Sequence, residues 1–184
     1  MNYLKPILLP ALLGIVLFAA CSSRDNAQTE NTPDSNTQEV AMSDKKKAPD
    51  FEVQTIEGKT ISLEQSLEEG KPMVVYFTAS WCPICARNWP VLSELYPEYK
   101  DKLNLVAIGI DPTDDVETMK KLAEKEGFTY PTTAGHPEIM MDFGVKSQAT
   151  TVGINRDGTI EFQKNKTALS EVEYRELFDS LVMN

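Results

Sequence analysis

The chain has 184 residues, of which 41% are hydrophobic, with three cysteines and one histidine. This length suits one domain of ordinary size. The formal net charge of −10 at pH 7 argues against nucleic acid or anionic lipid headgroups as main partners, because like charges repel. A soluble acidic surface is the simplest interpretation of this charge.

Residues 1–20 predict a signal peptide. Lys5 precedes the nearly unbroken apolar run Ile7–Ala20, which is too short to span a bilayer comfortably and ends in small residues. Cys21 follows the letters LFAA, a junction that resembles the bacterial lipoprotein signal, in which the cysteine is lipidated. An uncleaved anchor helix and ordinary secretory cleavage remain open alternatives. Each of the three places the domain outside the cytoplasm.

Residues 21–48 predict a lipidated cysteine and a flexible tether. The segment is rich in Ser, Asn, Asp, Thr, Gln, Glu and Lys and has almost no large apolar residue, so it cannot bury enough surface to fold. A flexible chain of this length spans roughly 30 Å. The folded domain is therefore expected at 49–184, close to a bacterial membrane in the periplasm or at the cell surface.

The folded region begins with a predicted β-hairpin. Residues 51–56 and 59–63 alternate apolar and polar side chains on either side of Glu57-Gly58. A short helical turn is expected at 66–70. The run Met73–Phe77 is continuously apolar, β-branched or aromatic, which is typical of a central buried strand.

Strands and helices alternate after this strand. A helix is predicted from Pro83, with a kink at Pro90 and an end near Pro97. A second buried strand is predicted at 104–110. An amphipathic helix is predicted at 116–126, where a glycine closes it.

The last part of the chain predicts a helix, a second hairpin and a final helix. The shorter helix covers 137–143, and strands at 150–154 and 159–163 flank an Asp-Gly turn. Ser170 and Glu173 form a capping-box pattern that opens the last helix. This order of elements predicts an α/β fold without internal repeats.

Cys82 and Cys85 lie three residues apart, directly after the first buried strand. A zinc site needs further ligands, and the domain has no other cysteine and a single histidine. A purely structural disulfide would close a very small loop and remove little entropy from the unfolded chain. Redox exchange is the interpretation that the position favours.

The predicted helix start gives the two cysteines different roles. Unpaired N–H groups and the helix dipole favour the thiolate, so we expect Cys82 to have a pKa below the free value of about 8.5 and to be the accessible, attacking sulfur. Cys85 lies one turn further along, less exposed, and is expected to resolve the mixed disulfide.

The region from Ala48 to the final helix resembles the thioredoxin-like thiol-disulfide oxidoreductases of the TlpA/ResA-like kind, within the redoxin/AhpC-TSA superfamily. The resemblance covers nearly all of the chain after the tether and is highly specific as a combination. The matching segments are APDF at 48–51, the hairpin at 57–59, residues 74–85, Pro90, 143–145, 150–151 and 155–158.

The resemblance implies a thioredoxin-like fold with a central mixed β-sheet flanked by helices and an N-terminal β-hairpin. It implies disulfide exchange with protein thiols and disulfides, without a cofactor or metal, using electrons from a membrane thiol reductase. Such proteins are often linked to cytochrome c maturation, and reduction is the favoured direction. The implied substrate groove comprises Trp81, Pro83, Ile84, Gln148, Ala149 and Thr150.

Ala149 departs from the family pattern, because the family has a cis-proline there. A cis bond before a residue other than proline costs about 2.5–4 kcal/mol, so we expect the Gln148–Ala149 bond to be trans. This loop is expected to offer backbone hydrogen bonds to the substrate, and Ala149 adds an N–H group that proline lacks.

Tyr76 and Asn88 are further departures. Many thioredoxins carry a buried acid at the position of Tyr76, and relatives often have a charged residue at the position of Asn88. Tyrosine, with an ordinary pKa of about 10, is a poor proton acceptor near neutral pH. We interpret Tyr76 as a core aromatic, so water or another carboxylate must take the proton of Cys85.

Other functions remain open from the residues alone. A peroxiredoxin-like peroxidase would need Thr three residues before its reactive cysteine, where Ala79 lies. A copper-binding or redox-inert module is the non-enzymatic alternative, with His136 as the one available imidazole. His136 is instead expected to be an exposed loop residue, and Trp89 and Met140-Met141 to be packing residues.

Overall fold

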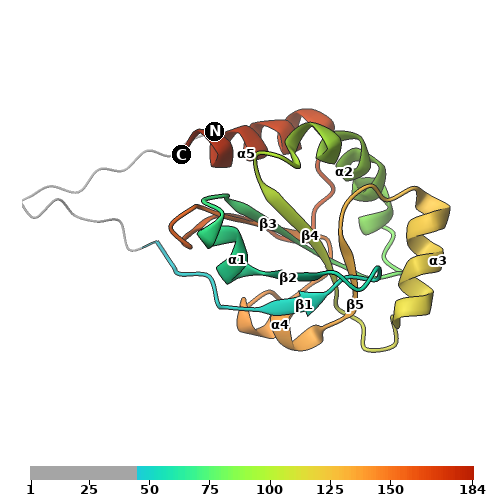
Figure 1. Cartoon of the computed structure of the whole chain (residues 1–184). Helices are drawn as coiled ribbons and strands as arrows, with labels where there is room; N and C mark the ends of the chain where they lie inside the picture. The colour runs from blue at the N-terminus through green and yellow to red at the C-terminus, as the bar shows by residue number, and fades with distance from the viewer. Residues whose placement is uncertain (1–44) are drawn as a thin grey trace, which may run out of the picture. The chain divides into compact units, whose positions relative to one another are not determined.

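The structure is a computed structural model that describes residues 45–184 (Figure 1). The predicted signal peptide at 1–20, the lipidation of Cys21 and most of the tether lie outside the described residues.

A five-stranded mixed sheet forms the centre of the described domain, in the order β5-β4-β3-β6-β7. The strands β3, β4 and β5 are parallel to one another, β6 is antiparallel to β3, and β7 is antiparallel to β6. This confirms the predicted central mixed sheet. The strands are β3 (Met73–Thr78), β4 (Asn104–Gly109), β5 (Thr132–Gly135), β6 (Thr150–Ile154) and β7 (Ile160–Lys164).

Strand β3 is buried on both faces, as its unbroken apolar run predicts. Alternate side chains point to opposite faces of a strand. Val74 and Tyr76 therefore join the apolar cluster of α2 (Cys85–Tyr99) and α5 (Glu171–Met183). Phe77 joins the opposite cluster, which includes Ile139 and Phe143. Figure 1 shows α2 and α5 above the sheet, and the N-terminal hairpin with α4 (Pro137–Asp142) below it.

The predicted N-terminal hairpin is present as β1 (Glu52–Gln54) paired with β2 (Thr60–Ser62). Helix α1 (Leu63–Glu68) begins earlier than the predicted turn at 66–70. The reason is that Ser62 is the N-cap of this helix, since its hydroxyl accepts a hydrogen bond from the Gln65 N–H at 3.0 Å. The alternation of apolar and polar residues at 59–63 predicts a strand there instead. Leu63 therefore belongs to the helix and not to the strand.

Helix α2 is as long as predicted but lies two residues further along the chain. It begins at Cys85, includes Pro90 and Pro97, and ends at Tyr99, so the predicted end near Pro97 is confirmed. Its last turn is supported by the aromatic core, where Tyr99 packs edge-on against Phe178 with ring centroids 5.2 Å apart. Tertiary packing thus outweighs the local cost of the proline.

Strand β5 was not expected from the sequence. It has four residues, starting with two threonines, and pairs with β4 through Ala107–Thr132 and Gly109–Gly135. The segment is short and polar and does not alternate between apolar and polar side chains, so its sequence does not predict a strand. Two consecutive β-branched threonines are nevertheless common in strands. Only the pairing with β4 makes it one.

The remaining elements agree with the predictions within about a turn. Helix α3 covers Val116–Glu126 and ends at Gly127, whose φ of 69° is left-handed. The capping box of Ser170 and Glu173 is present at the start of α5. Helix α4 covers Pro137–Asp142.

Contacts of the domain begin before residue 49. Lys47 forms an antiparallel bridge with Thr159, the Ala48 N–H donates to the Gly158 carbonyl at 2.9 Å, and the Ile160 N–H donates to Lys46 at 2.8 Å. Ile160 pairs with Ile154, at the end of the sheet where β3 begins. The chain therefore enters the domain at the sheet end opposite to the cysteines, which follow the other end of β3.

Ala149 has an unusual backbone for a residue with a side chain. Its φ is +56°, it is fully buried, and no peptide bond in the described residues is cis, so the Gln148–Ala149 bond is trans as expected. Its N–H donates to the Phe77 carbonyl at 2.8 Å, and its carbonyl accepts from the Thr167 N–H at 3.0 Å. Both backbone groups are therefore used inside the domain.

We predict that Ala149→Val lowers the free energy of unfolding by about 2–4 kcal/mol, because a β-branched side chain is strained at positive φ and this site is closely packed. Ala149→Gly is the matched control. It should stay within about 1 kcal/mol of wild type, since the relief of strain offsets the flexibility of glycine.

Urea unfolding of the wild type, Ala149→Val and Ala149→Gly measures the three free energies of unfolding. A valine variant as stable as the glycine variant would contradict the left-handed backbone at this position.

Candidate active site

Cys82 and Cys85 form a disulfide at the carboxyl end of β3, with their Cα atoms 5.2 Å apart. A six-residue turn, Ala79–Ile84, joins β3 to α2, which begins at Cys85, two residues later than the predicted start at Pro83. The Cys82 sulfur accepts the Cys85 N–H at 3.0 Å. The N–H group of the first residue of α2 therefore points at this sulfur, as the sequence predicts.

The expected accessibility of Cys82 is wrong for this disulfide form. Cys82 is 1% exposed and Cys85 is fully buried. The physical reason is that both lie in the apolar cluster that contains Ala79, Trp89 and Ala149, beneath the end of the sheet. A partner can reach the Cys82 sulfur only after a local movement of the surrounding turn.

The residues predicted to form the substrate groove divide into two groups. Trp81 is 58% exposed, Pro83 is exposed, and Ile84 and Gln148 are half-buried. Ala149 and Thr150 are buried.

Ala149 cannot offer the free backbone donor that the sequence predicts, and the Thr150 hydroxyl is also used inside the domain. The N–H of Ala149 is bound to Phe77. The Thr150 hydroxyl donates to the Ser147 carbonyl at 2.8 Å and accepts from the Lys166 N–H at 3.3 Å.

Two carboxylates of the loop between β4 and α3 hold the cysteine turn. Asp114 accepts hydrogen bonds from the Ser80 N–H at 2.8 Å and from the Ser80 hydroxyl at 2.5 Å. Asp111 accepts the indole N–H of Trp81 at 2.7 Å. Hydrogen bonds, first from Thr113 and then from Trp81, hold the pKa of Asp111 below its usual value.

These acids were not singled out from the sequence. The available signal was the acidic segment that follows the second buried strand, since the carboxyl ends of parallel strands meet at one edge of a sheet.

A buried polar network lies beside α2, where many thioredoxins carry a buried acid. The Asn88 amide donates to the Tyr76 hydroxyl at 3.1 Å and to the Thr167 carbonyl at 2.9 Å, while its oxygen accepts from the Leu169 N–H at 2.9 Å. Burial raises the pKa of Tyr76 above its usual value near 10. Tyr76 is a core aromatic, as predicted, and it cannot act as a base at neutral pH.

The other residues considered from the sequence have structural positions. Trp89 is buried and its indole N–H donates to the Thr78 hydroxyl at 3.0 Å. Met140 packs against the core, but Met141 is 66% exposed, so the prediction of two packing methionines is half wrong. His136 is the N-cap residue of α4, and its Nδ1 lies 2.9 Å from Glu138.

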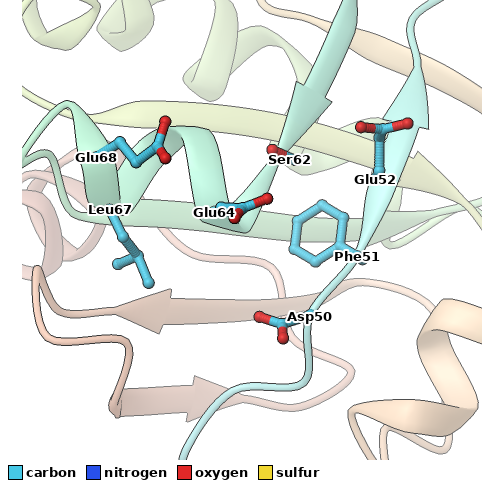
Figure 2. A pocket seen from close by; sticks show the side chains of 7 residues that line it. All are labelled: Asp50, Phe51, Glu52, Ser62, Glu64, Leu67 and Glu68. Carbon is cyan, nitrogen blue, oxygen red and sulfur yellow. The ribbon is translucent and has the colours of Figure 1, made fainter.

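A hollow of about 630 Å³ lies between the N-terminal hairpin and α1 (Figure 2). Its lining has four carboxylates and no cation, and none of the residues in the cysteine turn takes part. In the range 45–184, no group of three or more His, Cys, Asp or Glu side chains is arranged to hold a metal ion. The lining residues are Asp50, Phe51, Glu52, Ser62, Glu64, Leu67 and Glu68.

Comparisons with known proteins agree with this geometry. The model of the AhpC/TSA family matches residues 45–163. The thioredoxin-like protein YneN of Bacillus subtilis is 31% identical over 124 residues, covering 67% of this chain and 72% of YneN. The thiol-disulfide oxidoreductase ResA of Bacillus thuringiensis is 32% identical over 126 residues, covering 67% of this chain and 70% of ResA.

Solved structures share the fold. A thiol:disulfide interchange protein of Chlorobium tepidum has a TM-score of 0.68 at 22% identity, covering 77% of this chain and 99% of that protein. A secreted disulfide oxidoreductase of Mycobacterium tuberculosis has a TM-score of 0.62 at 25% identity, covering 71% and 96%. The chain therefore belongs to the AhpC/TSA family and is, like these relatives, a thioredoxin-fold oxidoreductase with a Cys-x-x-Cys pair.

Proposed function

We propose that this protein is a membrane-anchored, extracytoplasmic thiol-disulfide oxidoreductase that exchanges disulfides with protein partners through Cys82 and Cys85, and that it acts as a reductase. The observation that carries the proposal is the disulfide between these two residues at the start of α2, flanked by the exposed Trp81 and Pro83. The names of ResA and of the interchange protein support disulfide exchange as the reaction class.

The proposed reaction moves two electrons from the dithiol to a partner disulfide. The Cys82 thiolate attacks one partner sulfur, the partner S–S bond breaks, and the released partner thiolate takes a proton. The Cys85 thiolate then attacks the Cys82 sulfur, which breaks the mixed disulfide and forms the Cys82–Cys85 bond. The partner leaves with two thiols, and an external dithiol donor must reduce the enzyme again.

Helix α2 supports the first step. The N–H group of Cys85 already donates to the Cys82 sulfur, and this bond would also stabilise a thiolate. The proton of Cys85 must pass to water or to the departing partner thiolate, since the nearby Tyr76 and Asn88 are neutral and are bonded to each other.

Because Cys82 is buried, binding of the partner must expose its sulfur before the two can react. Its chain neighbours Trp81 and Pro83 are exposed, so a partner can contact this side of the turn. A docked partner segment would displace this turn and expose the sulfur as it binds. A small disulfide that has no segment to dock on this turn would therefore react more slowly with Cys82.

The proposed location rests on the N-terminal sequence. A lipid on Cys21 would anchor the protein, and a membrane thiol reductase would be its electron donor. In residues 45–184 no helix is sufficiently long and apolar to cross a membrane. Entry of the chain at Lys46–Ala48, at the sheet end opposite to the cysteines, fits a tethered domain whose tether does not cover the cysteine turn.

A peroxidase is the second candidate, because a thiolate at Cys82 could also attack a peroxide. Ala79 gives a peroxide no hydroxyl partner at the position where a peroxidase threonine was expected. Peroxide consumption by the reduced protein would favour this candidate.

The cysteines provide the first test. Wild-type protein should accelerate the reduction of insulin by dithiothreitol, whereas Cys82→Ser should lose this activity because no attacking thiolate remains. Cys85→Ser is the matched variant, since it keeps Cys82. It should accumulate a mixed disulfide with insulin, which non-reducing gels detect.

Equal rates for wild type and Cys82→Ser would refute the proposed oxidoreductase activity. Stoichiometric Cu(I) retention through both sulfurs would favour a metal-binding module.

The anchor is tested separately. Cys21→Ala should move the protein from the membrane pellet to the soluble extracytoplasmic fraction, because durable anchoring requires more than one acyl chain. A variant that stays in the membrane would indicate an uncleaved anchor helix. Soluble wild-type protein would indicate ordinary secretory cleavage.

A further inference from the structure

A buried carboxylate lies beside the cysteine turn. Asp114 is 2% exposed, and both of its oxygens accept hydrogen bonds from Ser80, at 2.8 and 2.5 Å. Both carboxylate oxygens therefore act as hydrogen-bond acceptors. Within the part of the chain that the structure describes, its charge has no cationic partner.

The neighbouring strand end holds this carboxylate in place. The Gly135 N–H donates to the Asp114 carbonyl at 2.8 Å, and the Asp114 N–H donates to the Asp111 carbonyl at 3.0 Å. A Cβ on Gly135 would lie 1.8 Å from the Asp111 carbonyl oxygen, so only glycine allows this close approach. The loop therefore cannot withdraw from Ser80 without disturbing β5.

The carboxylate is close enough to influence the sulfur. Ser80 precedes Cys82 by two residues, so their Cα atoms lie at most about 7 Å apart. A buried anion that is hydrogen-bonded to Ser80, two residues before Cys82, disfavours a second anion on the Cys82 sulfur, and the burial of Cys82 acts in the same direction. Both effects oppose the helix start, which favours the thiolate. A less stable thiolate shifts the equilibrium from dithiol to disulfide.

We propose that Asp114 is a positioning residue that holds the Ser80–Trp81 turn, and that its buried charge makes the Cys82–Cys85 pair a stronger reductant. The inference rests on the proposed function and deepens it, because it gives a physical cause for the direction of electron flow. Asp114 transfers no proton in this scheme. Its two effects, on geometry and on charge, are separable by substitution.

The test compares Asp114→Asn with Ser80→Ala. Asparagine keeps the shape and removes the charge, whereas Ser80→Ala keeps the charge and the backbone N–H bond and removes only the hydroxyl bond. Equilibration of each purified protein with glutathione gives the redox equilibrium constant, and the pH profile of Cys82 alkylation gives the thiolate fraction.

We expect Asp114→Asn to shift the equilibrium constant roughly three- to tenfold toward the dithiol, which is about 15–30 mV, and to raise the thiolate fraction at neutral pH. Ser80→Ala should stay within about twofold of wild type, because the charge remains. Equal constants for the two variants would overturn the proposal and leave Asp114 a purely structural residue.

A second pair of variants covers the case in which Asp114→Asn does not fold. Thr113 is exposed and precedes Asp114, so Thr113→Lys and Thr113→Glu change the local charge without touching the Ser80 bonds. Both lose the same hydrogen bond to Asp111. The lysine variant should favour the dithiol relative to the glutamate variant by about threefold, and equal constants would overturn the proposal.

The equilibrium with glutathione needs only the two cysteines. A failure of insulin reduction in wild type would therefore refute the proposed function without affecting this measurement.

Discussion

The parallel pairing of β3 with β4, and of β4 with β5, decides where chemistry can occur in this protein. Parallel strands bring their carboxyl ends to one edge, and here Thr78, Gly109 and Gly135 end side by side. The cysteine turn, the loop with Asp111 and Asp114, and the start of α4 therefore meet at this edge. Two glycines make the meeting possible, because a side chain at Gly109 or Gly135 would collide with the backbone beyond it.

Opposing electrostatic effects act on one sulfur at this edge. The N–H group of Cys85 stabilises negative charge on Cys82, while burial and the carboxylate of Asp114 disfavour it. A helix start alone would make the thiolate stable and the protein more oxidising. In this proposal, a loop from a separate segment of the chain modifies the chemistry of the Cys-x-x-Cys motif.

The departures from the family pattern are accommodated by hydrogen bonds within the domain. Ala149 uses its N–H to extend the pairing of β6 with Phe77, so the left-handed turn is held from both sides. Asn88 joins Tyr76 to the loop before α5, where a charged side chain would need a counter-ion in an apolar core. Neither Asn88 nor Tyr76 accepts a proton at neutral pH, so a proton from Cys85 must leave by another route.

Sequence patterns were sufficient to predict the α/β class, the Cys-x-x-Cys pair, strand β3, helix α3 and the capping box of α5, because each depends on periodicity, composition or a local hydrogen bond. Other features depend on contacts between segments that are distant in the chain. Strand β5 exists because β4 offers it a partner, α2 passes Pro97 because Tyr99 packs in the core, and Cys82 is buried because the sheet end and α2 close around it. The carboxylates that hold the cysteine turn come from a separate loop, and only the parallel register of the sheet brings Asp114 to Ser80.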